Sequence, residues 1–320
     1  MDSDTLIKVE HLSRRYGDTL AVNQLSFEVK RGEVLGFLGP NGAGKSTTMQ
    51  MLTGNLAPTA GAITINGIDM LENPKAAKLA LGFLPEQPPL YRELTVDEYL
   101  DYCARLNRIE KGKVAAAVEY AKERCGLTHM SQRLINNLSK GYQQRVGIAQ
   151  AIIHSPDVVI LDEPTVGLDP IQIREIRQLI RDIGTEHSVI LSTHILPEVQ
   201  ATCDRVQIIN RGELVLSDTI DGLTQRMQSS SLVVALRQPP ALETLGAIGG
   251  VTAVESLEGG RLRISHDPEQ NPAEQIVEQA VAAGWGLYEL TPERLSLEDV
   301  FVNITTTDHA TQSEQEEAAA

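Results

Sequence analysis

The sequence contains little cysteine and no cysteine pair. Its three cysteines, Cys103, Cys125 and Cys203, stand far apart among 320 residues and form no CxxC motif. That spacing suits a reducing cytosol, in which buried free thiols are the expected state. We therefore predict three unpaired thiols rather than a disulfide framework.

Long apolar runs are also missing. No stretch approaches the roughly 18–20 apolar residues of a membrane-spanning helix. The most apolar region, near residue 155, is interrupted by His154, Pro156 and Asp157. The N-terminal segment MDSDTLIKVE is acidic and lacks the basic start and apolar core of a signal peptide. We therefore expect a chain that does not cross a membrane on its own.

Positive charge is scarce. The chain has 28 Lys and Arg against 43 Asp and Glu, which gives a formal net charge of −15. Non-specific binding to nucleic acid requires clustered positive charge, so this balance disfavours it. Hydrophobic residues at 42% and charged residues at 22% are ordinary for a soluble globular protein. The length suits one large domain or two smaller ones.

The first ~220 residues alternate apolar strands with amphipathic helices. Several strands are continuous apolar runs, as expected for a parallel sheet covered on both faces. Between about 86 and 157 the strand pattern gives way to helices. A capping box at Thr95 opens a helix towards Asn107, a second helix stops at Gly126, and a third starts near Ser139. We predict an α/β core with an inserted helical subdomain. The expected strands of the core are Leu6–Glu10, Ser26–Val29, Val34–Leu38, Ala62–Ile65, Val158–Leu161, Val189–Ser192 and Val206–Asn210.

The polar run QRMQSSS, near residues 222–230, is a candidate linker and places a boundary after a first domain over 1–222. Beyond it, the elements follow the order β-α-β-β-α-β, which predicts a small split-βαβ domain of α+β type over 231–305. A last short helix is predicted over Ser296–Ile304. Residues 306–320 are acidic and almost without apolar bulk, so a disordered tail is expected there.

A glycine-rich segment follows the predicted strand VLGFL and precedes a helix-compatible run. It matches the pattern G-x-x-x-x-G-K-[ST]. Glycines let backbone N–H groups turn towards a phosphate, and a helix N-terminus adds unpaired donors and a positive dipole end. Lys45 can reach the β- and γ-phosphates, and Ser46 can ligate Mg²⁺. The predicted phosphate-binding residues are Gly39, Pro40, Asn41, Gly42, Ala43, Gly44, Lys45, Ser46 and Thr47.

Two carboxylates, Asp162 and Glu163, follow a later apolar strand. Ligands in open α/β sheets bind at the carboxyl ends of the strands. Asp162 can hold Mg²⁺ through water, because Mg²⁺ keeps several of its waters. Glu163 is placed to polarise an attacking water. Acids also end strands in ordinary turns, so it is the combination with the phosphate loop that predicts a nucleotide-hydrolysing site.

Together with the phosphate loop, four further motifs resemble those of ATP-binding-cassette (ABC) ATPases and follow the order of that family. The segment LSKGYQQR, with Ser139 and Gly141, resembles the family's signature sequence. GLD, which ends at Asp169, resembles the D-loop, and STH, which ends at His194, resembles the switch histidine. Tyr16 resembles the aromatic residue that stacks on adenine. The resemblance implies a P-loop ABC cassette with a RecA-like α/β core, an antiparallel β subdomain and an inserted helical subdomain.

The resemblance also implies a mechanism and partners. Two copies would dimerise head-to-tail around two ATP molecules, each bound by one phosphate loop and capped by the signature of the other copy. Glu163 would activate the attacking water, His194 would hold it with the γ-phosphate, and Mg²⁺ would be the metal cofactor. The expected partner is an integral membrane permease on a separate chain, with no nucleic acid. The expected location is cytoplasmic, peripheral on the inner face of the cell membrane.

Two features depart from the usual family pattern. Lys140 and Tyr142 stand where the signature usually has Gly and Gln. The usual metal-binding Gln of the Q-loop would fall on Glu86, with Gln87 next to it, so the Q-loop ligand is one of these two residues. The stretch PEQPPLYRELTVDEYL and the later LSLEDVFVNIT are similar to ATPase subunits of bacterial exporters of the drug, polysaccharide or gliding-motility type.

Two other functions compete with transport. The first is a soluble ABC ATPase that acts on nucleic acid or ribosomes. Only about ninety residues separate the phosphate loop from the signature, too few for a long coiled coil, and the chain carries a single cassette. The second is a non-hydrolysing scaffold, which the presence of Glu163 and His194 disfavours. We predict an ATPase that powers export through a separate membrane permease.

Overall fold

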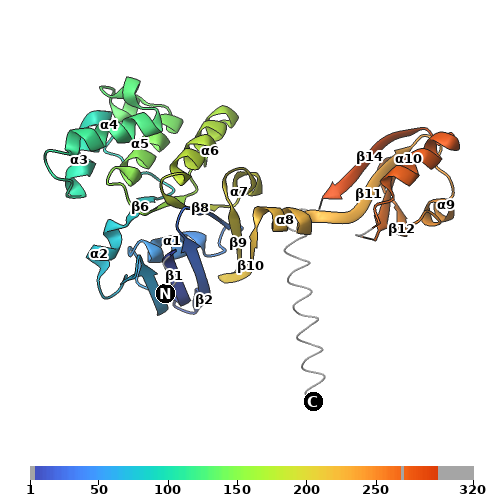
Figure 1. The fold of residues 1–320 in the computed structure, drawn as a ribbon, viewed down its shortest axis with the longest axis horizontal. Helices are drawn as coiled ribbons and strands as arrows, with labels where there is room; N and C mark the ends of the chain where they lie inside the picture. The colour runs from blue at the N-terminus through green and yellow to red at the C-terminus, as the bar shows by residue number, and fades with distance from the viewer. Residues whose placement is uncertain (1–3, 268–269, 295–320) are drawn as a thin grey trace, which may run out of the picture. The chain divides into compact units, whose positions relative to one another are not determined.

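The structure is a computed structural model that describes residues 4–267 and 270–294 (Figure 1). The chain divides into two compact units, and the division falls between Ile220 and Asp221. Within the described ranges, no helix is long and apolar enough to cross a membrane. The predicted helix over Ser296–Ile304 and the predicted tail over 306–320 lie outside the described residues.

The first unit is built around a six-stranded sheet with the order β10-β9-β3-β8-β7-β6. The pairs from β9 to β6 are parallel, and β10 is an antiparallel edge strand. Every residue of β3, β7 and β8 is buried, as expected for strands covered on both faces. The strands are β3 (Val34–Leu38), β6 (Leu81–Leu84), β7 (Val158–Asp162), β8 (Ser188–Thr193), β9 (Arg205–Asn210) and β10 (Glu213–Thr219).

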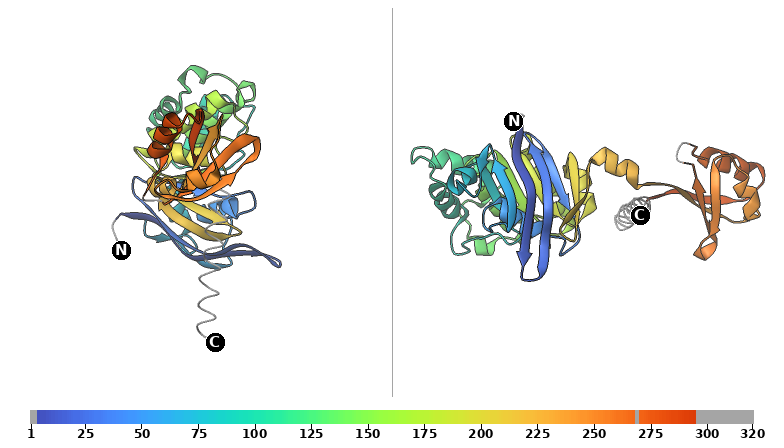
Figure 2. Two further views of the ribbon diagram at one scale, coloured as in Figure 1. Left: turned by 90° about the vertical axis from the view of Figure 1, so that its right-hand side faces the viewer. Right: turned by 90° about the horizontal axis from the view of Figure 1, so that it is seen from below.

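An antiparallel sheet with the order β2-β1-β4-β5 forms a second layer of this unit. Its long strands β1 and β2 lie side by side across one face of the unit (Figure 2). One buried cluster joins this sheet to helix α1 and to the parallel sheet, and it includes Phe37, Met49 and Ile63. The elements are β1 (Thr5–Tyr16), β2 (Thr19–Lys30), α1 (Lys45–Leu52), β4 (Ala60–Ile65) and β5 (Ile68–Asp69).

Helices α3, α4 and α5 form the inserted subdomain, and no strand lies between β6 and β7. The predicted capping box is confirmed: the Thr95 hydroxyl accepts a hydrogen bond from the Glu98 N–H, and the Glu98 carboxylate accepts one from the Thr95 N–H. Gly126 ends α4 with a φ of 66°, a left-handed conformation that favours glycine. The helices of this unit are α2 (Pro74–Leu79), α3 (Val96–Leu106), α4 (Val114–Cys125), α5 (Lys140–Ile152), α6 (Pro170–Gly184) and α7 (Leu196–Thr202).

The second unit contains a four-stranded antiparallel sheet with the order β12-β13-β11-β14. The chain order of its elements is β11-α9-β12-β13-α10-β14, which confirms the predicted split-βαβ pattern. Its own apolar cluster includes Val234, Ile264, Ile276 and Trp285. The elements are α8 (Ile220–Met227), β11 (Gln228–Leu236), α9 (Leu242–Gly246), β12 (Val251–Ser256), β13 (Arg261–His266), α10 (Ala273–Ala282) and β14 (Leu287–Arg294).

The polar run near 222–230 is not an irregular linker, so this prediction is wrong. Helix α8 continues to Met227, and strand β11 starts at Gln228 without a loop between them. Polar composition is compatible with a strand here because β11 pairs on both sides, with β13 and with β14. The hydroxyl of Ser231, for example, donates a hydrogen bond of 2.6 Å to Glu293 on β14.

Candidate nucleotide site

The predicted phosphate loop links the central strand β3 to helix α1. Gly42 and Gly44 have φ angles of 81° and 102°, which only glycine adopts without strain. Gly39 is packed so closely that a Cβ atom there would lie 2.3 Å from the carbonyl oxygen of Ile209 on β9. The glycines of the motif are therefore required by the backbone path, and that path leads into the N-terminus of α1 at Lys45.

Lys45 is the buried cation of the site, with 5% of its surface exposed. Its Nζ atom donates hydrogen bonds to the carbonyl oxygens of Gly39 at 2.8 Å and Pro40 at 3.3 Å. It also lies 3.5 Å from Oε1 of Glu163. A buried ammonium requires such partners. The carbonyl oxygens of the loop therefore hold the charged end of Lys45 beside the loop itself.

Asp162 ends β7 and Glu163 follows it at the carboxyl edge of the sheet, and both are buried. The Oδ1 atom of Asp162 is buried without a hydrogen-bond partner, and so is Oγ of Ser192, its register neighbour on β8. An unpartnered buried carboxylate oxygen is costly unless it binds a cation or ordered water. The donor set, a carboxylate with hydroxyls close by, fits Mg²⁺, a hard cation that prefers oxygen.

Glu163 contacts His194 as well as Lys45. Nδ1 of His194 lies 3.0 Å from Oε2 and 3.1 Å from Oε1 of Glu163. The φ of Glu163 is 48°, an uncommon left-handed value for a residue with a side chain, and its N–H donates to the Ser192 carbonyl at 2.8 Å. Strain of this kind concentrates at functional sites. Three residues that are far apart in sequence, Lys45, Glu163 and His194, thus form one contact group.

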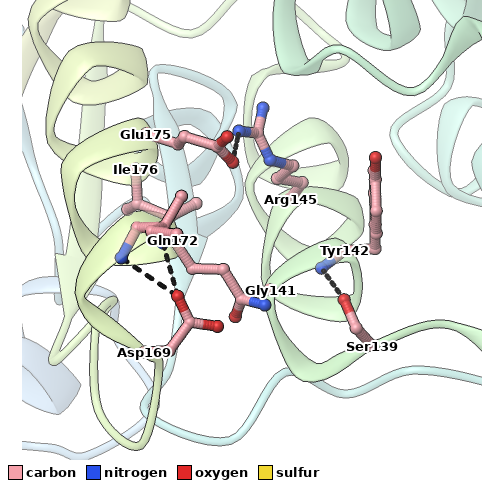
Figure 3. A pocket seen from close by; sticks show the side chains of 9 residues that line it. Ser139, Gly141, Tyr142, Arg145, Asp169, Gln172, Glu175 and Ile176 are labelled. Carbon is pink, nitrogen blue, oxygen red and sulfur yellow. Dashed lines mark hydrogen bonds and ion pairs between the residues drawn. The ribbon is translucent and has the colours of Figure 1, made fainter.

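The signature residues occupy a different place in the first unit. Ser139 caps α5 and accepts a bond from the Tyr142 N–H, and Asp169 caps α6 and accepts bonds from the Ile171 and Gln172 N–H groups. Ser139, Gly141 and Asp169 line a shared cavity of about 270 Å³, and Figure 3 shows them near the starts of the two helices. No residue of the phosphate loop lines this cavity.

The remaining predicted residues lie near these two groups. Tyr16 ends β1 and is 45% exposed, and the guanidinium of Arg14 lies 4.7 Å from its ring centroid. Arg14 pairs with Val22 on β2, and Val22 packs close to Gly44 of the phosphate loop. The hairpin that carries Tyr16 therefore lies beside the loop.

Glu86 and Gln87 follow strand β6 and line a cavity of about 560 Å³. Lys140, the unusual residue of the signature, lines the same cavity. Its side chain packs so closely on Gly167 that a Cβ atom there would meet the Lys140 Nζ at 2.2 Å. The structure thus brings the Q-loop candidates next to the signature helix and leaves both as possible ligands.

The sequence reasoning missed a buried group behind the carboxylates. Glu198, in the first turn of α7, is 1% exposed and accepts hydrogen bonds from the hydroxyls of Thr165 and Thr193. An isolated Glu in a helical segment gives no sequence signal for such a role, because acids are common in first helical turns.

Comparisons with known proteins agree with this geometry. Residues 22–166 match the model of the "ABC transporter" family. The bacitracin transport ATP-binding protein BcrA of Bacillus licheniformis is 36% identical over 303 residues, which cover 94% of this chain and 97% of that relative. The ABC transporter ATP-binding protein NatA of Bacillus subtilis (strain 168) is 36% identical over 233 residues, 71% of this chain and 95% of NatA.

Solved structures extend the similarity to three dimensions. CbiO1 from Clostridium perfringens, described as part of the ABC transporter complex cbiONQ, has a TM-score of 0.64 and 30% identity, over 69% of this chain and 90% of that one. The predicted α/β cassette with its helical and antiparallel subdomains is therefore confirmed. With 36% identity to BcrA over nearly the whole length of both chains, and with Lys45, Glu163 and His194 in one contact group, the chain belongs to the ATP-binding proteins of ABC transporters and is an ATPase.

Proposed function

We propose that two copies of this chain hydrolyse ATP at two shared sites and thereby drive a membrane permease on a separate chain. The observation that carries the proposal is the contact group of Lys45, Glu163 and His194 at the carboxyl edge of the sheet. The group brings a cation, a carboxylate and an imidazole together, and a phosphate bound at the start of α1 would meet its attacking water beside them.

Each member of the group has a distinct part in ATP hydrolysis. Phosphoryl transfer to water needs positioning and neutralisation of charge more than covalent chemistry. Lys45 neutralises the β- and γ-phosphates. Glu163 accepts a proton from the attacking water, and His194, 3.0 Å from Glu163, orients that water and the γ-phosphate. Tyr16 offers the face of its ring that Arg14 does not cover to the adenine.

Mg²⁺ is the metal we propose for this site. Asp162, with its unpartnered Oδ1, and the Ser46 hydroxyl would hold the ion. A bound Mg²⁺ neutralises charge on the β- and γ-phosphates during the reaction. Glu86 or Gln87 would complete the ligand set from the Q-loop.

The separation of the two residue groups supports a shared site between copies. Ser139, Gly141 and Asp169 line a cavity without any phosphate-loop residue. We propose that they meet the nucleotide of the second copy, because the hydroxyl and N–H groups at the start of α5 can bind a γ-phosphate there. In a symmetric dimer, one interface then forms both sites.

Transport is the use of this ATPase that the relatives support. BcrA is named for bacitracin transport, and the linearmycin resistance ATP-binding protein LnrL of Bacillus subtilis (strain 168) matches 94% of this chain at 31% identity. Such names favour export through a separate integral membrane permease, with this chain bound peripherally at the cytoplasmic face of the cell membrane. They give no support to the alternative of a nucleic-acid or ribosomal partner.

We also propose that residues 1–222 form the catalytic domain and that residues 231–305 form an accessory domain. NatA, which matches only about 233 residues over 95% of its length, supports a cassette that functions without the second unit. A fragment of residues 1–225 should bind Mg-ATP and melt at a higher temperature with it, because a ligand of the folded state alone stabilises that state. Aggregation of the fragment, or a melt indifferent to nucleotide, would contradict the proposed boundary.

The substitution Glu163→Gln tests the catalytic proposal. It keeps the size of the side chain but removes the base, so turnover should fall by about 10²–10⁴-fold while ATP binding is retained. An ATP-dependent dimer should also accumulate and be visible by light scattering. Glu186→Gln, at an exposed acid of the same domain, is the matched control and should leave turnover unchanged. Full activity of Glu163→Gln would rule out the assigned role.

Mixing two inactive variants tests the shared site. Ser139→Arg blocks the signature, and Lys45→Ala blocks the phosphate loop. A mixed dimer of the two contains one site with both parts intact, so mixing should restore turnover that neither variant shows alone, up to about a quarter of the wild-type rate for random pairing. A mixture as inactive as its components would contradict the shared site.

A further inference from the structure

Glu198 is the most completely buried carboxylate near the site, at 1% exposure, and the mechanism above does not use it. It lies in the first turn of α7, directly after the segment that carries His194. Since an ionised carboxylate is costly to bury without partners, its contacts identify what it serves.

The two oxygens of Glu198 bind two different catalytic segments. Oε1 accepts a hydrogen bond from the hydroxyl of Thr165, two residues after Glu163. Oε2 accepts one of 2.8 Å from the hydroxyl of Thr193, the residue before His194. One carboxylate therefore ties the chain after β7 to the last residue of β8, next in sequence to His194.

The Thr193 hydroxyl also fixes the backbone around His194. It accepts a hydrogen bond of 3.1 Å from the N–H of Ile195 while it donates to Glu198. The two residues that flank His194, Thr193 and Ile195, are thus joined by a hydrogen bond through the Thr193 hydroxyl. Thr165 is similarly restrained, since it is 2% exposed and its carbonyl accepts a bond from the Leu168 N–H.

Positive charge near Glu198 comes from Arg177 on α6. Its Nη2 atom lies 3.9 Å from Oε1 of Glu198, and its side chain is 24% exposed. At that distance the pair is a weak one, so the two threonine hydroxyls are the principal partners of the carboxylate. Buried ionic groups of this kind are weak contributors to stability compared with apolar packing. Their value lies in the geometry that they select.

We infer that Glu198 is a positioning residue that holds Glu163 and His194 at their contact distance, an inference that rests on the roles proposed for those two residues. Its two carboxylate oxygens bind the hydroxyls of Thr165 and Thr193. Its effect reaches the reaction through Thr165 and Thr193, and it sets the geometry in which the base and the imidazole share one water molecule. Misplacement of such groups by about 1 Å can cost on the order of 100-fold in rate.

The test compares Glu198→Ala and Glu198→Gln in the full-length chain. Glu198→Ala loses both acceptors, so kcat should fall by about 10- to 100-fold. Affinity for Mg-ATP should change less than about threefold, because the Lys45 contacts are untouched. Glu198→Gln keeps the shape and one acceptor oxygen and should recover most of the lost rate. The pH dependence of kcat, which reports the ionisations of the bound complex, should shift in Glu198→Ala.

A second carboxylate provides the matched control. Glu33 has an 11% exposed side chain and pairs with Arg205 at 2.6 Å, at the opposite end of the central strand from the phosphate loop. Glu33→Ala should lower the melting temperature without a change in kcat or its pH profile. If Glu198→Ala behaves as Glu33→Ala does, with a lower melting temperature and unaltered kcat and pH profile, Glu198 is structural and the inference is wrong.

If Glu198→Ala does not fold, variants that lack the hydroxyls of Thr165 and Thr193 provide a second test. Thr165→Val and Thr193→Val each remove one hydroxyl at nearly constant volume, and the double variant should approach the rate loss of Glu198→Ala. A double variant with wild-type kcat would contradict the inference. The Glu163→Gln variant distinguishes failure of the proposed function from failure of the role of Glu198. An active Glu163→Gln overturns the proposed function. An inactive Glu163→Gln together with a fully active Glu198→Ala overturns only the role of Glu198.

Discussion

The two units of the chain use β-sheets in opposite ways. In the first unit, strands β3, β7 and β8 are buried along their whole length, since layers cover both faces of the sheet. In the second unit, β13 alternates between buried and more exposed residues, and two of its three less buried side chains, Arg261 and Arg263, are ionic. Arg261 pairs with Glu289 at 3.0 Å, and Arg263 pairs with Glu293 at 2.7 Å.

This difference explains where the chemistry lies. A doubly covered parallel sheet brings the carboxyl ends of its strands to one edge, and there the chain must leave the core with its polar groups. The phosphate loop, Glu163 and His194 all follow strands at that edge, and Asp162 ends one. An antiparallel sheet distributes its strand ends over two edges. In the described part of the second unit, Arg261 and Arg263 of β13 instead form ion pairs with β14, on the far side of β11.

The largest expected effects come from substitutions that create a cavity in the hydrophobic core of one unit at a time. Ile190 and Ile264 are both 0% exposed, one in each unit. Replacing either by Ala should destabilise its own unit by about 2–5 kcal/mol. The single Trp of the chain, Trp285, is 9% exposed in the second core, so its fluorescence reports the second unit alone. Ile264→Ala should lower the midpoint temperature of the melt followed by Trp285 fluorescence. Ile190→Ala should lower only the midpoint temperature of the calorimetric transition of the cassette.

Val277→Ala is the control for both, because it removes the same kind of group from an exposed position on α10. Its effect should stay within about 0.5 kcal/mol. If either core substitution moved both transitions together, the units would unfold as one and the contrast between them would not extend to stability.

Lys45→Ala should have the next largest effect, confined to nucleotide binding. Loss of a charge-assisted hydrogen bond costs about 1.5–3 kcal/mol, which is roughly 10- to 150-fold in affinity for ATP. Binding of a labelled ATP analogue measures this change. Lys75→Ala, at an exposed lysine on α2, is the control. With the wild-type chain, Mg-ATP should raise the cassette transition and leave the Trp285 melt unchanged. Unaltered binding by Lys45→Ala would remove the phosphate-loop assignment.

The ion pairs of the second unit should contribute much less. Arg263 makes a two-pronged contact with Glu293, yet its side chain is 37% exposed. Solvent-exposed pairs are worth about 0–1 kcal/mol and weaken with salt. Arg263→Met should therefore lower the Trp285 melt slightly at low salt and hardly at all at high salt. A loss of several kcal/mol that persists in high salt would show that this polar face is part of the folding core.

A shallow pH dependence should distinguish the cassette further. Burial lowers the pKa of His154, whose ring nitrogen Nε2 lies 3.0 Å from the Leu81 carbonyl. The folded cassette therefore favours the neutral ring, and the unfolded chain binds the proton more tightly. Stability should be complete above about pH 6.5, the unfolded pKa, and should fall as the pH drops below it. His154→Gln should reduce that acid sensitivity of the calorimetric transition. An identical pH dependence in the variant would exclude His154 as its source.

Local signals predicted the parts of the molecule in which one segment determines its own structure. The phosphate loop was predictable because its glycines, Lys45 and flanking strand are contiguous, and the capping box at Thr95 because its two partners lie three residues apart. Glu198 was not, since its meaning depends on Thr165, which is 33 residues away. The start of β11 was missed for the same reason, because its polar residues are paired by strands that follow much later.

The strand order of the first unit has a consequence for synthesis on the ribosome. Strand β3, which leads into the phosphate loop, pairs with β8 and β9. The N–H of Val34 donates a hydrogen bond to the side chain of Asp204, 170 residues later. At about 5–20 residues per second, roughly 10–30 s pass between the emergence of these partners. ATP therefore cannot assist folding until almost the whole cassette has left the ribosome. During most of that interval the apolar strand VLGFL has neither of its two sheet partners, β8 and β9.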